Sequence, residues 1–264
     1  MMFIKSQGWV KCILPLYIYV FLPFYLLTFL PLPAAAVTKA AADEAYRQEK
    51  YQEAARQYEQ LLEKGVSADL YYNLGNAYYR MDNITKAVLN YERALLLSPG
   101  DKDIRFNLQM ARSKTIDKIT PESEMFFVMW YRSCVNLMSV DAWAVLALVS
   151  LVLVIILSLI YLFSNPVWLR KVGFFGGFLM LFLFLVSNLF AWEQKRVLQN
   201  RTGAIVIKSA VNVKSTPSAG GTDLFILHEG TKVTITDSSM RDWIEIRVAD
   251  GKTGWLECSQ VEVI

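Results

Sequence analysis

Two long runs of uncharged, apolar residues constrain the fold of this 264-residue chain more than any other feature. They are AWAVLALVSLVLVIILSLIYLF at 142–163 and VGFFGGFLMLFLFLVSNLFAW at 172–192. At a rise of about 1.5 Å per residue, each run reaches roughly 30 Å as a helix, which is the thickness of a bilayer's hydrocarbon core. A buried helix of a soluble protein seldom stays apolar on every face over this length. We therefore predict a helical hairpin that crosses a membrane twice, turning at 164–171.

The first 36 residues predict export from the cytoplasm. Lys5 and Lys11 precede a long apolar stretch, Cys12–Pro33, and three alanines, Ala34–Ala36, follow it. A basic start, an apolar centre and small residues at the exit describe a secretory signal peptide, and we predict cleavage near Ala36. An uncleaved anchor is the alternative, because the apolar stretch is longer than a typical signal core. The prolines within it argue against a stable spanning helix.

The orientation of the hairpin depends on this signal peptide. Arg170 and Lys171 lie between the apolar runs, as expected for a cytoplasmic loop, but basic residues also follow the second run, so local charge alone is ambiguous. Export of the N-terminal region resolves the ambiguity. We expect an inner-membrane, multi-pass protein with its two polar regions, 37–141 and 193–264, in the bacterial periplasm.

The first polar region carries a helical repeat pattern. Its clearest copy consists of Tyr71, Leu74, Gly75 and Tyr78, followed by Ala87, Tyr91, Ala94 and Pro99. This spacing resembles the tetratricopeptide repeat, in which small residues let two antiparallel helices approach while aromatic residues fill the space between them. A weaker copy consists of Tyr51, Ala54, Tyr58 and Leu61, and a capping helix is expected from Ile104, Leu108 and Ala111.

The resemblance to tetratricopeptide repeats implies a concave groove that binds extended peptides or partner helices. Matching the sequence to the groove-facing helix of the clearer repeat gives Tyr72, Asn73, Asn76, Tyr79 and Arg80 as the partner-binding residues. Asparagine and arginine side chains could hold a peptide backbone or a carboxylate. The alternative is that these are ordinary solvated residues. Lysines that complete a carboxylate clamp in some family members are not evident, which disfavours specificity for a C-terminal peptide.

The second polar region changes to the alternating pattern of short β-strands, separated by turn residues. The pair Asp250–Gly251 predicts a hairpin with a type I′ turn. The motifs VNVKSTPS at 211–218, LHEGTKVTI at 227–235 and DWIEIRVADGKTGWLE at 242–257 resemble the bacterial SH3-like (SH3b) family. The resemblance implies a small barrel that binds peptidoglycan or peptides. We expect Trp243 and Trp255 to have a mainly structural role, with contact to a ligand as the less favoured alternative.

Composition disfavours enzymatic and metal chemistry. The formal charge is only +3, which gives no reason to expect nucleic acid as a partner, and the chain has one histidine and three cysteines. Cys12, Cys134 and Cys258 form no CxxC pair, and His228 has no nucleophile framework around it. We therefore predict a non-catalytic protein with no catalytic residues, cofactor or metal.

The order of these segments resembles the BatE-type family of the Bacteroides aerotolerance operon. The resemblance implies a scaffold for protein–protein interaction in an envelope complex, beside membrane proteins with von Willebrand A domains and a MoxR-type ATPase. One alternative is an envelope-anchored peptidoglycan-binding sensor that acts through the SH3b domain. Another is an accessory domain of a cell-wall hydrolase, which would predict muralytic activity.

The predicted fold class is multidomain, with all-α tetratricopeptide repeats, a two-helix transmembrane hairpin and a small all-β SH3-like barrel. The predicted segments are a signal peptide (1–36), a repeat domain with a capping helix (37–118), a juxtamembrane linker (119–141), a transmembrane helix (142–163), a cytoplasmic loop (164–171), a second transmembrane helix (172–192), a linker (193–202) and an SH3b domain (203–264).

Overall fold

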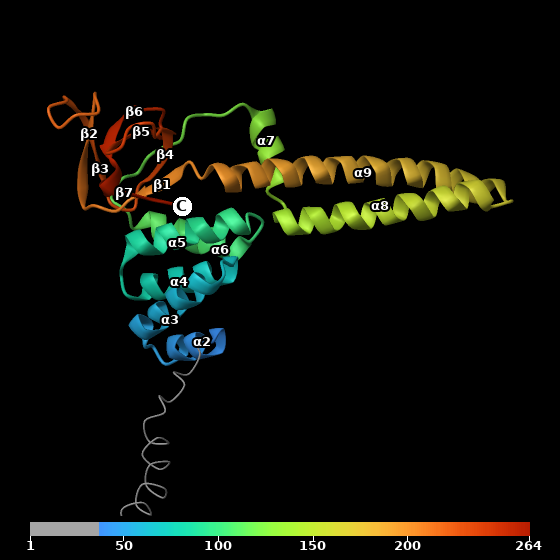
Figure 1. Cartoon of the computed structure of the whole chain (residues 1–264), viewed down its shortest axis with the longest axis horizontal. Helices are drawn as coiled ribbons and strands as arrows, with labels where there is room; N and C mark the ends of the chain where they lie inside the picture. Colours follow the sequence, from blue (N-terminus) through green and yellow to red (C-terminus); the bar gives the residue numbers. More distant parts are fainter. Residues whose placement is uncertain (1–36) are drawn as a thin grey trace, which may run out of the picture. The chain divides into compact units, whose positions relative to one another are not determined.

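The computed structural model describes residues 37–264, so the predicted signal peptide at 1–36 lies outside the described residues. Figure 1 shows the order of the elements, with short helices first, then two long helices and finally a β-sheet. The described part of the chain is therefore multidomain. It combines all-α repeats, an apolar two-helix hairpin and an all-β domain, as the sequence predicts.

The first five described helices form what we call the helical repeat region. They are α2 (Lys39–Arg47), α3 (Tyr51–Lys64), α4 (Ala68–Arg80), α5 (Ile84–Leu97) and α6 (Lys102–Ser113). Each helix packs against the next one in the sequence (Figure 1). Four of these helices are capped by a side-chain oxygen that accepts a hydrogen bond from a backbone N–H of the first turn. The capping residues are Thr38 (α2), Ser67 (α4), Asn83 (α5) and Asp101 (α6). Each cap sets where its helix begins.

The backbone repeats itself between the first and second helix pairs. Glu49, between α2 and α3, has φ 61°, and Asp82, between α4 and α5, has φ 58°. These left-handed residues are about one repeat period of 34 apart. A side-chain-bearing residue adopts this conformation only where the chain must turn sharply. The weaker first repeat is therefore built on the same helix–turn–helix geometry as the second.

Small residues bring the helices close enough for tyrosines to fill the core. Ala42 and Ala87 are fully buried, and Tyr58 and Tyr91 are each 1% exposed. At Gly75, an added Cβ would lie 2.7 Å from the ring of Tyr91. The aromatic ring therefore occupies the space that a side chain at Gly75 would need, which explains the residue type at this point of the repeat.

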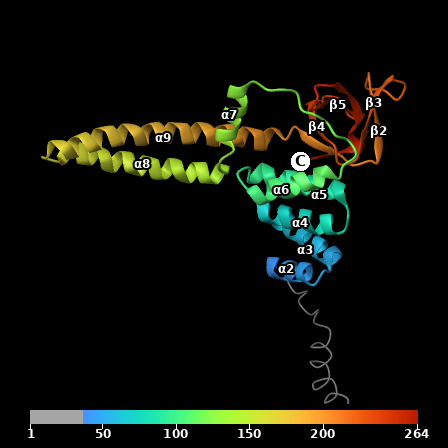
Figure 2. The same ribbon diagram turned by 180° about the vertical axis from the view of Figure 1, so that it is seen from behind.

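The two apolar runs form long helices, which we call the apolar hairpin. Helix α8 spans Val140–Phe163 and helix α9 spans Val167–Asn200, and the two pack side by side (Figures 1 and 2). At Gly173 an added Cβ would lie 2.7 Å from the carbonyl oxygen of Leu157, so the backbones touch. Both helices are long and apolar enough to span a membrane, and their outward-facing apolar side chains are exposed. Helix α9 continues well past the apolar run, so most of 193–202 is helical.

Seven strands in the described part of the chain form the C-terminal β domain. They are β1 (Gly203–Val206), β2 (Ala210–Lys214), β3 (Asp223–His228), β4 (Lys232–Asp237), β5 (Trp243–Val248), β6 (Thr253–Glu257) and β7 (Val261–Val263), with a short 3₁₀ helix, Cys258–Gln260, before the last. The spatial order is β3-β2-β6-β5-β4-β1-β7, and the paired strands are antiparallel. Alternate strand residues are buried, as the two-residue sequence period predicts.

The predicted hairpin between β5 and β6 is confirmed, but its predicted type I′ turn is wrong. The N–H of Val248 donates to Lys252 O at 2.9 Å, and the N–H of Gly251 donates to Val248 O at 3.0 Å. Gly251 has φ 86°, whereas Asp250 is not among the described residues with positive φ. A type I′ turn needs positive φ at both central residues, so the chain instead uses a three-residue loop that ends on a left-handed glycine.

The helical repeat region and the β domain contact each other directly, because α5 packs against β1. Arg93 pairs with Glu262 at 3.0 Å and donates to Val263 O at 2.6 Å. Glu92, whose side chain is 3% exposed, accepts Lys232 at 2.8 Å and is also bonded by Arg112. We call this contact the domain junction. It joins residues far apart in the sequence through a buried carboxylate and a set of charged hydrogen bonds.

Candidate partner-binding groove

Helix α4 carries all five residues that the sequence predicts for partner binding. The hydroxyl of Ser67 accepts the N–H of Leu70 and starts the helix. Spacings of three, four and seven residues then place Tyr72, Asn76 and Tyr79 along one side of α4. Gly75, three residues after Tyr72 and four before Tyr79, lies next to this side of the helix and packs against the ring of Tyr91 on α5.

A cavity of about 410 Å³ opens along this side of α4. Four of the five predicted residues line it, together with side chains from α2, α5 and α6. The complete lining is Tyr46, Tyr72, Asn76, Tyr79, Arg80, Tyr91, Asn107 and Met110. The cavity, which we call the groove, is therefore mainly aromatic, with amide groups and one cation.

The floor of the groove is a closed network of hydrogen bonds. Tyr91 Oη donates to Asn76 Oδ1 at 2.7 Å, and Asn107 Nδ2 lies 3.0 Å from the same oxygen. Asn107 Nδ2 is also 2.9 Å from Tyr72 Oη. The oxygen of Asn76 is thus engaged by groups from α5 and α6. Asn76 positions the floor of the groove, and its carbonyl is already satisfied before any partner arrives.

The cationic end of the groove is more open. Arg80 is exposed, and the hydroxyl of Tyr46 raises the pKa of its guanidinium group. Lys114 lies 4.5 Å from the centre of the Tyr79 ring and 3.5 Å from Asp82. Arg80, the cation that lines the groove, lies beside an aromatic wall and can attract an acidic or amide-bearing segment of a partner.

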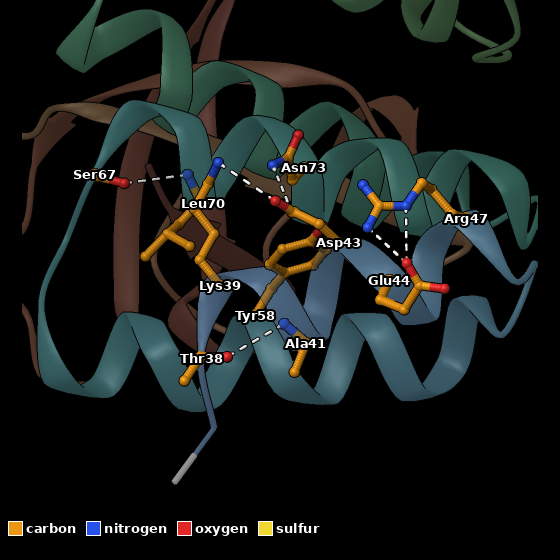
Figure 3. Close-up of polar contacts among 10 residues, drawn as sticks. All are labelled: Thr38, Lys39, Ala41, Asp43, Glu44, Arg47, Tyr58, Ser67, Leu70 and Asn73. Carbon is orange, nitrogen blue, oxygen red and sulfur yellow. Dashed lines mark hydrogen bonds and ion pairs between the residues drawn. The ribbon is translucent and has the colours of Figure 1, made fainter.

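Asn73, the fifth predicted residue, does not line the groove. Figure 3 shows it directed at Asp43 of α2, with Asn73 Nδ2 at 3.4 Å from Asp43 Oδ1. The same carboxylate accepts the hydroxyl of Tyr58 at 2.6 Å and pairs with Lys39 at 3.6 Å. Asn73 thus belongs to a polar contact that ties α2 to α3 and α4.

The tyrosine hydroxyls of this region are held in their neutral form. Burial raises the pKa of Tyr91 and of Tyr72. Burial, followed by the hydrogen bond to Asp43, raises the pKa of Tyr58. These groups therefore act as hydrogen-bond donors and as apolar surface at neutral pH. Their arrangement suits recognition of a surface or a peptide.

Sequence reasoning missed four residues of the groove: Tyr46, Tyr91, Asn107 and Met110. Tyr46 and the α6 residues lie outside the repeat copy that carries the motif. The repeat pattern predicts Tyr91 as a core residue, and in the structure it is both buried in the core and part of the groove lining. Only the approach of α2 and α6 to α4 in three dimensions brings the four together.

His228 links the β domain to the segment after α6. Its ring Nδ1 lies 2.8 Å from Asp117 Oδ1, and its backbone N–H donates to Asp117 Oδ2 at 2.7 Å. The hydroxyl of Thr231 donates to Asp117 Oδ2, also at 2.7 Å. Burial by itself raises the pKa of Asp117, but these three hydrogen bonds outweigh it and hold the pKa below its usual value. The one histidine is thus engaged in a structural contact.

The two tryptophans of the β domain are half-buried strand residues. Trp243 is paired with Glu257, and Trp255 is paired with both Glu245 and Lys214. Among residues 37–264, no three side chains of the metal-ligating types come together, and Cys134 and Cys258 are free.

Comparison with known families supports both folded regions. A tetratricopeptide repeat model matches residues 68–101, and a bacterial SH3 domain model matches residues 209–260. The chain therefore contains a tetratricopeptide repeat and a bacterial SH3 domain, the two folds that carry the groove and the β domain. Both are typically non-catalytic interaction domains. A search among curated proteins finds no match.

Proposed function

We propose that this protein is a non-catalytic scaffold of the bacterial inner membrane, which recruits a partner protein through the groove of its helical repeat region. The observation that carries the proposal is the groove itself. It is an aromatic cavity of about 410 Å³ with a prearranged polar floor and a cationic end. A groove whose side chains are already fixed loses little conformational freedom when a partner binds.

The apolar hairpin supplies the membrane attachment in this proposal. The chain crosses the membrane in α8 and crosses back in α9, so the hairpin begins and ends on the same side of the membrane. The helical repeat region and the β domain therefore share one face of the membrane. The direct contact of α5 with β1 supports this arrangement, because domains on opposite faces could not touch. With the predicted signal peptide, that face is the periplasmic one.

The segment order supports a place in an envelope complex of the BatE type. In such a complex, the partners are membrane proteins with von Willebrand A domains. The groove residues Tyr72, Asn76, Tyr79 and Arg80 would contact these partners. Asn73 contributes indirectly, by holding α2 against α4.

The test is affinity purification of the tagged full chain from native membranes in mild detergent. Arg80→Glu reverses the charge at the open end of the groove, and we expect it to remove the specific partners. Lys64→Glu is the control, because Lys64 is exposed at the end of the neighbouring helix α3 and lines neither the groove nor the second cavity that Arg80 borders. An unchanged partner set in Arg80→Glu, or an equal loss in both variants, contradicts the proposal.

A second candidate function is peptidoglycan binding by the β domain. Strand β3 lies at the edge of the sheet, and its Leu224 and Ile226 are 51% and 55% exposed. Apolar side chains beside unpaired backbone groups can bind a glycan or peptide strand. The purified full chain in detergent should then sediment with sacculi, and Ile226→Asp should abolish this. Sedimentation no greater than that of a control membrane protein rejects the second candidate.

A further inference from the structure

Helix α7 (Phe126–Val135), which lies between the helical repeat region and α8, exposes large apolar side chains. Phe126 is 78% exposed, Phe127 63% and Trp130 62%. Phe126, Met129 and Trp130 are spaced by three and four residues, so they share one face of the helix. The only charge within α7 is Arg132, which pairs with Glu124 at 2.8 Å. We call the side chains of Phe126, Phe127, Met129 and Trp130 the aromatic face.

The C-terminal end of α7 is fixed at the level where the apolar hairpin begins. Trp143 Nε1, in the first turn of α8, donates to Val135 O at 2.9 Å. Gln194 Nε2, just after the apolar run of α9, donates to the same oxygen at 2.6 Å and to Met138 O at 2.7 Å. These three hydrogen bonds are at the boundary between apolar and charged residues on both long helices.

The course of α7 relative to the hairpin agrees with this position. In both views α7 runs across α9 and not along it (Figures 1 and 2). The ring of Tyr131, on the inner side of α7, packs against Phe190 of α9 with 5.9 Å between centroids. Phe126 and Met129 lie on the opposite side of α7 from Tyr131, and Phe127 lies at the edge of the exposed side. A helix that crosses a membrane span at its boundary lies parallel to the membrane surface.

We propose that α7 is an interfacial helix, whose aromatic face enters the headgroup–acyl boundary of the outer leaflet. This inference rests on the membrane insertion of α8 and α9 in the proposed function. The occupant is lipid because the aromatic face is continuous with the exposed apolar surface of the hairpin, at the depth where Trp and Phe rings partition favourably. With a single, already paired cation in α7, binding depends on apolar burial and requires no anionic lipid. The helix thereby fixes the linker, and the groove-bearing region before it, close to the membrane surface.

Site-directed spin labelling of the full chain tests this proposal. Phe127→Cys and Trp130→Cys place labels on the aromatic face, in a background where Cys12, Cys134 and Cys258 are serine. Leu148→Cys on α8 is the control for the membrane interior, and Ile226→Cys on β3 is the control for water. The protein is reconstituted in vesicles of phosphatidylcholine alone, and accessibility to oxygen and to a water-soluble nickel chelate is measured.

The labels at 127 and 130 should be shielded from the nickel chelate and accessible to oxygen, at a depth of about 5–10 Å below the phosphate level. Chelate accessibility equal to that at 226 overturns the proposal. Shielding from both reagents also overturns it, since the face would then be covered by protein, and spin–spin broadening would identify a second copy of the chain. A label at 148 that is open to the chelate refutes membrane insertion itself, which separates failure of the proposed function from failure of this inference.

Discussion

The ion pair between Lys232 and Glu92 predicts how firmly the β domain is held on the helical repeat region. Exposed ion pairs contribute about 0–1 kcal/mol, whereas removing one partner of a buried pair costs about 3–5 kcal/mol. The side chain of Glu92 is 3% exposed and that of Lys232 is 44% exposed. Because Arg112 stays bonded to Glu92, Lys232→Met should weaken the domain junction by about 1–2 kcal/mol, or roughly 5–30-fold in its opening equilibrium.

Hydrogen exchange at His228 reports this opening. Its backbone N–H donates to Asp117, in the segment directly after α6 and beside the domain junction, so it exchanges when the β domain separates from this end of the helical repeat region. In the purified full chain in detergent, Lys232→Met should accelerate exchange in the peptide containing His228 by the same factor. Lys252→Met is the matched control, because Lys252 pairs with Asp250 on an exposed turn, and it should leave exchange unchanged.

If the Lys232→Met variant exchanges at the rate of the Lys252→Met control, the ion pair does not hold the domain junction closed. A double-mutant cycle with Glu92→Gln provides a second check, because directly interacting residues couple by about 0.5–3 kcal/mol. Strictly additive effects of Glu92→Gln and Lys232→Met would show that the two residues do not act together.

Three further predictions concern pH and close packing. The pKa of Asp117 is lower in the folded protein than its ordinary value of 3.8. The stability that the ionised Asp117 gives to the contact between the β domain and the segment after α6 is therefore complete above pH 3.8. It is lost as the pH falls through the lowered pKa. The distance between spin labels on the two domains should therefore lengthen only below about pH 4, and Asp117→Asn should remove that pH dependence. Gly75→Ala should lower the midpoint of thermal unfolding followed by circular dichroism, because overpacking costs about 1–3 kcal/mol and exceeds the gain in helix propensity of up to about 1 kcal/mol. Gly65→Ala, which meets open space, should not lower it. Gly173→Ala should separate α8 from α9 and reduce cysteine cross-linking between them, whereas Gly177→Ala, whose Cβ would meet only an ordinary contact, should preserve cross-linking.

Elements whose side chains repeat with a fixed period could be predicted from the sequence. The apolar runs, the helix pair of the repeat and the alternating strands each place one kind of side chain at regular intervals, and regular intervals define a face. The packing of Gly75 against Tyr91 could also be predicted, because the repeat motif specifies the close approach of its own two helices.

The groove floor and the domain junction could not be predicted, because their partners are far apart in the sequence. Asn76 was expected to contact a partner, yet its oxygen is engaged by groups of α5 and α6. Thr85 of α5 donates to Glu229 of the β domain at 2.9 Å, across more than half of the chain. Nothing in the local pattern around either residue specifies such a pairing.

The placement of both domains on the periplasmic face, on which the proposed scaffold depends, is tested most directly by cysteine labelling in intact spheroplasts with a membrane-impermeant maleimide. Native Cys258 reports on the exposed surface of the β domain, Lys64→Cys on the helical repeat region, and Asn165→Cys on the loop between α8 and α9, each as the single cysteine. We expect labelling at 258 and 64 in intact spheroplasts, and at 165 only after permeabilisation. Labelling at 165 with protection at 258 and 64 would contradict it.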